Sequence, residues 1–239
     1  MGRKTRHPAV AGTVSAAGTG TAPKPAIEML PYLLRPTRLP ADLLLPSRMN
    51  HRLHLKFEQL ERATEHLIAS AEALGTDKTQ APAAGKWSAV QVVHHLLFIE
   101  GNIIQYIQKK MLAEEALPKV GLFTRLRAQF VRLFLRLPGL KVKAPRGVAT
   151  VTDAGNLPSL PELRATWEAS RRQLERLLNE FPSRQLNRAI FPHPRSGRIN
   201  IYQVMEFLLD HLLHHQQQMN RITKVLRPAG VARTADAQA

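Results

Sequence analysis

Residues 201–222 read IYQVMEFLLDHLLHHQQQMNRI, and this stretch decides the fold because it predicts one long amphipathic helix. Its apolar side chains recur at intervals of three and four residues and therefore share one face: Val204, Phe207, Leu208, Leu212 and Met219. His211 and His215 lie one turn apart, so both imidazoles can reach one metal ion from a single helix. His214 follows His211 by three residues, so spacing alone leaves the pairing open. The alternative is a histidine-rich face in contact with solvent, and a third ligand elsewhere would favour the metal site.

A second helix carries two histidines inside an apolar run. Residues 86–112 read KWSAVQVVHHLLFIEGNIIQYIQKKML. Ser88 followed by Gln91 predicts a capping box, from which the helix is expected to run to about residue 116. His94 and His95 lie in the apolar part of that helix. A neutral imidazole buried there needs partners for both ring nitrogens, which either hydrogen bonds or a metal ion must supply.

The same capping pattern marks two further helix starts. Ser159 is followed by Glu162, and Asn200 is followed by Gln203. Trp87, directly before the Ser88 cap, is expected to pack on the first turns of its helix as a hydrophobic staple. Both histidine-bearing helices therefore have defined starts, and their histidines lie two to four turns from those starts.

The sequence predicts an all-α fold with four core helices, over residues 49–74, 88–116, 159–180 and 201–222. The connection 117–157 is long enough to cross a bundle from one end to the other. It is expected to contain an extra short basic helix. The loop 181–200 is expected to hold a short extended piece at about residues 188–191. We therefore expect a four-helix bundle with a long connection between the second and third core helices.

Composition divides the chain into a central domain and two extensions. Residues 1–48 are rich in proline and arginine and are expected to be a disordered N-terminal extension. The bundle is expected to span residues 49–226, and residues 227–239 are expected to be a disordered tail. No apolar run approaches the roughly 18–20 residues of a membrane span.

The chain has no cysteine, which excludes disulfides and thiolate metal sites and fits a cytoplasmic protein. Its net charge is +16, and residues 119–147 hold eight lysines and arginines without an acid. In that basic segment, apolar residues alternate with Arg125, Arg127, Arg132 and Arg136. We expect a short helix packed on the bundle, although the segment could instead contact nucleic acid or an anionic membrane. There is no nucleic-acid recognition motif, and few aromatic residues are present for base stacking.

Two motifs together resemble a known family. WSAVQVVHHL resembles the Trp-Ser-(six residues)-His-Leu signature of the DinB/YfiT-like (DinB-like domain) superfamily. HPRSGRINIYQVMEFLLDHLLHHQQQ resembles that superfamily's ending, in which His-Pro and Gly precede His-xxx-His-xx-Gln. The resemblance covers about residues 49–226 and implies a four-helix bundle.

The resemblance also implies site residues. The implied metal ligands are His95, His211 and His215, with His95 chosen over His94 because it directly precedes a leucine. Gln218 matches the closing glutamine of the motif. His193 matches the His-Pro step, and either faces the site or stabilises a turn.

The predicted site also includes two acidic residues and a metal ion. Asp210 and Glu206 neighbour the histidines in sequence and could orient an imidazole from outside the coordination sphere, or form a solvated acidic edge. A divalent metal is implied, and three imidazoles suit Zn, Ni, Fe or Mn. Characterised members of the superfamily include metal-dependent transferases and isomerases that use low-molecular-weight thiols.

Three functions follow from these residues. The first is a metalloenzyme that acts on a small-molecule substrate by thiol-dependent transfer or isomerisation, or by hydrolysis. The second is a metal-binding bundle without catalysis, such as a sensor. The third is a module whose basic segment 119–147 binds nucleic acid or an anionic membrane. The sequence also leaves a homodimer open.

Overall fold

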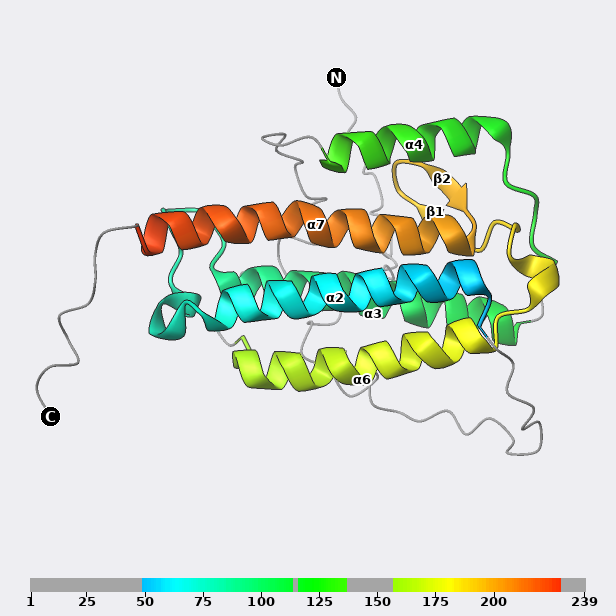
Figure 1. Ribbon diagram of the computed structural model, residues 1–239. Helices are drawn as coiled ribbons and strands as arrows, with labels where there is room; N and C mark the ends of the chain where they lie inside the picture. The colour runs from blue at the N-terminus through cyan, green and yellow to red at the C-terminus, as the bar shows by residue number, and fades with distance from the viewer. Residues whose placement is uncertain (1–48, 114–115, 137–156, 229–239) are drawn as a thin grey trace, which may run out of the picture.

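The computed structural model describes residues 49–113, 116–136 and 157–228, and most of them are helical (Figure 1). The five α-helices are α2 (His51–Glu72), α3 (Ala89–Leu112), α4 (Leu122–Arg136), α6 (Leu160–Asn179) and α7 (Ile201–Leu226). Two short 3₁₀ helices, η2 (Gly75–Thr79) and η3 (Ser183–Gln185), and two strands, β1 (Phe191–His193) and β2 (Gly197–Ile199), complete the described chain. The all-α prediction is confirmed. The predicted extension 1–48 and most of the predicted tail lie outside the described residues.

Helix starts follow the predicted caps. The backbone N–H of Gln91 donates to Ser88 Oγ at 3.3 Å, and Gln91 Oε1 accepts from the Ser88 N–H at 2.8 Å. The reciprocal pair is also present at Asn200 and Gln203, with distances of 2.9 and 3.1 Å. Each box satisfies backbone donors that a first helical turn leaves unpaired. These local contacts fix the residues at which α3 and α7 begin.

The end of α3 differs from the prediction. The helix stops at Leu112 with Ala113 as its C-cap, and not near residue 116. Two glutamates follow in the sequence at positions 114 and 115. Negative charge is unfavourable at a helix C-terminus because the helix dipole is negative there.

Four long helices lie alongside one another around a common core (Figure 1). α2 packs mainly on α7, while α3 packs on α6 and also contacts α7. The apolar face of α2 is buried and runs from Leu53 to Ala71. Trp167 of α6 is among the largest fully buried side chains. Burying such side chains supplies the main stabilisation of the fold.

A buried ion pair joins α3 to α6. Arg171 donates to Glu100 through Nε at 2.8 Å and through Nη2 at 2.9 Å. Trp167 Nε1 donates to the same carboxylate at 3.2 Å, and Arg171 Nη2 also donates to Thr64 Oγ1 at 2.7 Å. We call Thr64, Glu100, Trp167 and Arg171 the Glu100 network. It was not predicted from the sequence.

The extra basic helix is α4, which lies on the outer side of α7 and also contacts β2 (Figure 1). Arg132 attaches it to α7: its Nε donates to Asp210 at 2.8 Å and its Nη1 donates to Glu206 at 2.8 Å. This arginine therefore points toward the fold, and not toward an external phosphate.

The loop before α7 forms a small hairpin. Phe191 pairs with Ile199 and His193 pairs with Gly197 in antiparallel register. The predicted extended piece at about residues 188–191 was too early, although Arg188 forms an isolated bridge with Lys119. Gly197 has φ of 83°, a left-handed conformation that favours glycine. The hairpin places His193 beside α7. Within the described residues, no helix is long and apolar enough to cross a membrane.

Candidate metal centre

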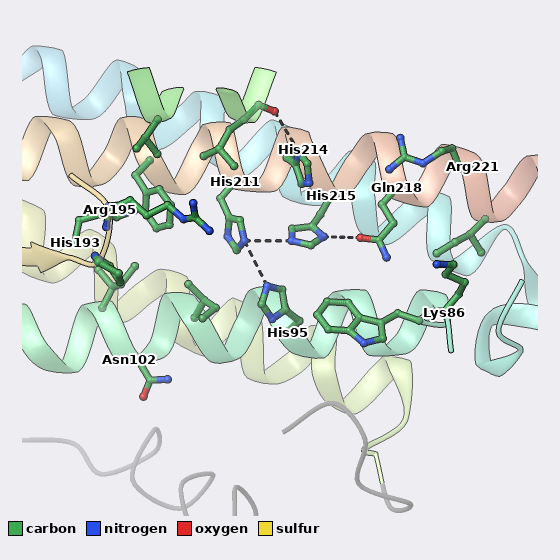
Figure 2. Close-up of a pocket in the computed structure, with 18 of the residues that line it drawn as sticks. Lys86, His95, Asn102, His193, Arg195, His211, His214, His215, Gln218 and Arg221 are labelled. Atoms are coloured by element: carbon green, nitrogen blue, oxygen red, sulfur yellow. Dashed lines mark hydrogen bonds between the residues drawn. The ribbon is translucent and has the colours of Figure 1, made fainter. Parts of the chain in front are cut away.

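Three histidines from α3 and α7 converge on one point (Figure 2). His211 Nε2 lies 3.1 Å from His215 Nε2 and 3.4 Å from His95 Nε2. One ring nitrogen from each residue lies within 4.8 Å of the other two. The structure thus brings together the three predicted ligands. His94 and His214, the alternatives that spacing left open, are not in this cluster.

Two of the three nitrogen separations match those of ligands on a single metal ion. Zinc–nitrogen bonds of about 2.0–2.1 Å in tetrahedral geometry separate two ligand nitrogens by roughly 3.3 Å. The two nitrogen pairs of 3.1 and 3.4 Å lie close to that value. Hydrogen bonds alone satisfy these three nitrogens poorly. A proton on His211 Nε2 can form a well-aligned hydrogen bond to only one of its two neighbours, His95 Nε2 or His215 Nε2. The three histidines could therefore hold a metal ion.

Gln218 fixes the tautomer of His215. Its side-chain oxygen Oε1 lies 2.9 Å from His215 Nδ1, one turn farther along α7. Because an amide oxygen only accepts, Nδ1 carries the proton and the Nε2 lone pair faces the cluster. His95 Nδ1, by contrast, is buried without a hydrogen-bond partner among the described residues. The predicted glutamine therefore touches the site in the way that metal-site partners orient an imidazole.

Burial keeps the cluster neutral. Desolvation lowers the pKa of His95 to about 4, with a further contribution from His94. Burial lowers the pKa of His215 to about 3, followed by the effect of His95. The pKa of His211 is also far below its usual range, because of burial first and of His215 second. At neutral pH all three rings keep a lone pair, which metal binding requires.

Aromatic side chains enclose the cluster. The Trp87 ring lies 4.9 Å from that of His95 and 6.2 Å from that of His215. The Phe207 ring stacks on that of His211 at 5.4 Å. The sequence predicted a helix staple at Trp87 and not this contact. The Trp-Ser step of the family motif was the available signal.

The cluster borders a cavity of about 1310 Å³ that α3, α4, α7, the hairpin and the loop before α3 line together. His211 is partly exposed into it. The lining is mainly apolar, from Trp87, Ile99, Ile103, Phe130, Val131, Leu135, Phe191, Phe207, Ile222 and Val225. A concave, mostly apolar space beside a few polar groups is typical of small-molecule sites.

His193 lines the same cavity from the hairpin (Figure 2). Its Nδ1 accepts from the backbone N–H groups of Arg195 and Ser196, at 3.3 and 3.0 Å. Burial lowers its pKa to about 4, with a further contribution from Arg195. The ring is therefore neutral and carries its proton on Nε2. Both roles that the sequence left open are seen, because His193 stabilises the turn and also faces the cavity.

Asp210 and Glu206 are buried, so a solvated acidic edge is excluded. Both carboxylates accept from Arg132, and Arg52 lies 3.6 Å from Glu206. These contacts tie α4, one wall of the cavity, to the helix that carries two of the histidines. That Asp210 also orients an imidazole stays a prediction.

Comparison with known proteins agrees with this geometry. A sequence model described as the DinB superfamily matches residues 59–219, about two thirds of the chain. The chain belongs to the DinB superfamily. No curated protein and no solved structure matches it significantly. The DinB match includes all three converging histidines, Gln218 and the hairpin.

Proposed function

We propose that this DinB-superfamily protein is a metalloenzyme in which His95, His211 and His215 bind one divalent ion through Nε2. The observation that carries the proposal is the convergence of three neutral ring nitrogens, with the 3.1 and 3.4 Å separations, at the edge of a large cavity. Structural zinc sites are closed by four protein ligands, whereas catalytic sites keep a position open. Three histidines beside a cavity correspond to the second case.

The chemistry that such an ion supplies is Lewis acidity, which lowers the pKa of a bound thiol or water molecule. We propose a low-molecular-weight thiol as cosubstrate, as the resemblance to the characterised members of the superfamily implies, and the absence of cysteine from the chain is consistent with a thiol that comes from outside. Zinc, nickel, iron and manganese all suit three imidazoles. Hydrolysis by an activated water is the alternative chemistry at the same site.

The chain's own residues have distinct roles in this proposal. Gln218 holds His215 in the tautomer that presents Nε2. His193 offers an Nε2–H donor to a substrate oxygen, since its Nδ1 is already engaged by two backbone amides. Trp87 and Phe207 exclude water from the histidine rings. Exclusion of water strengthens every electrostatic interaction in a site.

The proposal extends to the whole domain. We propose that α2, α3, α6 and α7 form the four-helix bundle of the superfamily and that residues 49–226 are one structural unit that acts in the cytoplasm. The packing of α2 on α7 and of α3 on α6 supports the bundle.

Metal content of four single variants tests the metal site, because two of the three proposed ligands have a neighbouring histidine as a control. His95→Ala and His215→Ala should lose the metal that purified wild-type protein contains, as measured by elemental analysis. His94→Ala and His214→Ala should retain it. Equal metal content in all four variants would contradict the proposal.

Activity tests the enzymatic part separately. The metal-loaded protein should consume a small electrophile faster when low-molecular-weight thiols are added, and His211→Ala should abolish that acceleration. Turnover without thiol that depends on the metal would indicate hydrolysis. Tight metal binding without either activity would contradict the enzyme and leave a metal-binding protein without catalysis.

A further inference from the structure

Four basic side chains reach the cavity from four different parts of the chain: Lys86, Arg127, Arg195 and Arg221. They come from the loop before α3, from α4, from the hairpin turn and from α7. Figure 2 shows Arg195 on the hairpin side of the histidines, and Lys86 and Arg221 beyond Gln218 on the other side. Positive charge is thus present on both sides of the candidate metal centre.

None of these four side chains forms an ion pair within the part of the chain that the structure describes. Among the described residues, those that line the cavity include no aspartate or glutamate. By contrast, Arg132 and Arg171 are each engaged by carboxylates in the interior. No described side chain therefore compensates the charge at the cavity, and a cleft with charge of one sign concentrates ligands of the opposite sign.

Apart from the histidines, Asn102 and Gln218, the lining between the basic groups is apolar. Ile99, Ile103, Phe207 and Ile222 contribute side chains to its lining. The volume of about 1310 Å³ exceeds the roughly 300–1,000 Å³ of common ligand sites, so an extended molecule can be accommodated. A small inorganic anion would leave this apolar surface uncovered, whereas a neutral apolar molecule would leave the cations without a partner.

We infer that the cavity binds amphiphilic organic anions, with a carboxylate-type head at Arg195 or Arg221 and an apolar body along the wall between α3 and α7. As an assignment of substrate class this inference rests on the proposed function. Binding of the anion itself does not require a metal ion, so this inference and the proposed function can fail separately.

The test uses three probes on the full chain after metal removal with a chelator: decanoate, 1-decanol and acetate. Binding is followed by tryptophan fluorescence. The chain has two tryptophans, of which Trp87 lines the cavity and Trp167 is buried elsewhere in the core. A Trp87→Phe variant should therefore lose the fluorescence response. Decanoate should bind up to about fivefold more tightly than 1-decanol, as expected for one ion pair near the surface. Acetate should not saturate in the same range.

Two substitutions locate the charge. Arg195→Gln and Arg221→Gln should weaken decanoate binding, up to about fivefold for the arginine that meets the head group, and leave 1-decanol unchanged. Arg176→Gln is the matched control, because Arg176 is exposed on α6 and does not line the cavity. Equal affinities for decanoate and 1-decanol, or decanoate binding that neither arginine affects, would overturn the inference.

Repeating the titration with His215→Ala separates this inference from the metal proposal. Preference for decanoate in a variant that holds no metal supports the anion site by itself. Decanoate binding that occurs only after a divalent metal is added, and that ignores both arginines, would show an anion bound to the metal. That result would overturn the inference while the metal proposal stands.

Discussion

Helix α3 carries two buried polar side chains five residues apart, and they meet opposite environments. Glu100 is 3 % exposed and His95 is 5 % exposed, so burial does not distinguish them. Glu100 faces α6, where Arg171 and Trp167 donate three hydrogen bonds to its carboxylate. His95 faces α7, where its Nε2 meets another imidazole nitrogen at 3.4 Å.

The two clusters differ in whether hydrogen-bond donors face acceptors. In the Glu100 network every contact joins a donor to an acceptor, which is how a fold satisfies buried charge. In the histidine cluster, groups of the same kind point at one another, and each is neutral because of burial. Such an arrangement stabilises the fold little until something binds to the lone pairs. We therefore expect the first cluster to control stability and the second to control ligand binding.

Breaking the Glu100 network should have the largest effect on stability. Glu100→Ala leaves the Arg171 guanidinium buried without its main partner, which typically costs about 3–5 kcal/mol. Urea unfolding of the metal-free protein measures the loss. Replacing both partners, with Glu100→Leu and Arg171→Met in one chain, should recover most of it, because a well-packed apolar pair often substitutes for a buried ion pair. If Glu100→Ala is as stable as wild type, the Glu100 network does not control the stability of the fold.

Adding metal should stabilise the protein through the histidine cluster alone. A ligand present at 100 times its dissociation constant raises the free energy of unfolding by about 2.7 kcal/mol. Thermal unfolding with and without zinc should show this increase in wild type and not in His211→Ala. The Glu100→Ala variant should keep the response to zinc, although its baseline is lower. Loss of the response in Glu100→Ala would mean that the two clusters are coupled.

Gln218→Leu tests whether the partner of His215 contributes to the metal affinity of the histidine cluster. It removes the acceptor that orients His215, and loss of such a partner typically lowers metal affinity by about 10–100-fold. Competition with a chromophoric chelator measures the affinity. Gln217→Leu, on the same helix and not part of the cavity lining, is the control and should bind metal like wild type. If the two variants bind metal with equal affinity, Gln218 does not contribute to the metal site.

The smallest of these effects should be the change in the free energy of unfolding per pH unit. In the folded state the pKa of His95 and of His193 is about 4, below the ordinary value of 6.5. Between these values the unfolded chain binds more protons, so the metal-free protein should lose stability as pH falls from 6.5 toward 4. Each of these two histidines should contribute a slope of up to about 1.4 kcal/mol per pH unit. Urea unfolding at several pH values measures the total slope, and His95→Gln should reduce it by the contribution of one histidine. A slope of the opposite sign would mean that these rings are charged when folded.

Much of the helical framework could be predicted from local signals. The capping boxes at Ser88 and Asn200 act over three residues, so the starts of α3 and α7 were predicted correctly. The i, i+4 spacing of His211 and His215 likewise places both rings on one helix face. The identity of the third histidine came from the family motif, since nothing local distinguishes His95 from its neighbour His94.

Long-range contacts were not predictable in this way. The Glu100 network joins residues 71 positions apart in sequence, and the ion pair between Arg132 and Asp210 spans 78. Neither partner in these pairs carries a local pattern that points to the other. The extended piece was expected at about residues 188–191, whereas β1 runs from Phe191 to His193, and its partner β2 was not predicted, because strand pairing depends on the partner segment.

The sequence by itself determined where α3, α6 and α7 begin, which faces are apolar and which histidines share a turn, since all three depend on residues no more than four apart. Only the tertiary structure decided how α3 is rotated against α6 and α7. That rotation directs Glu100 to a cation on one side and His95 to two imidazoles on the other. It also brings basic groups from four elements to one cavity, because packing of the whole core, and not any single helix, sets these orientations.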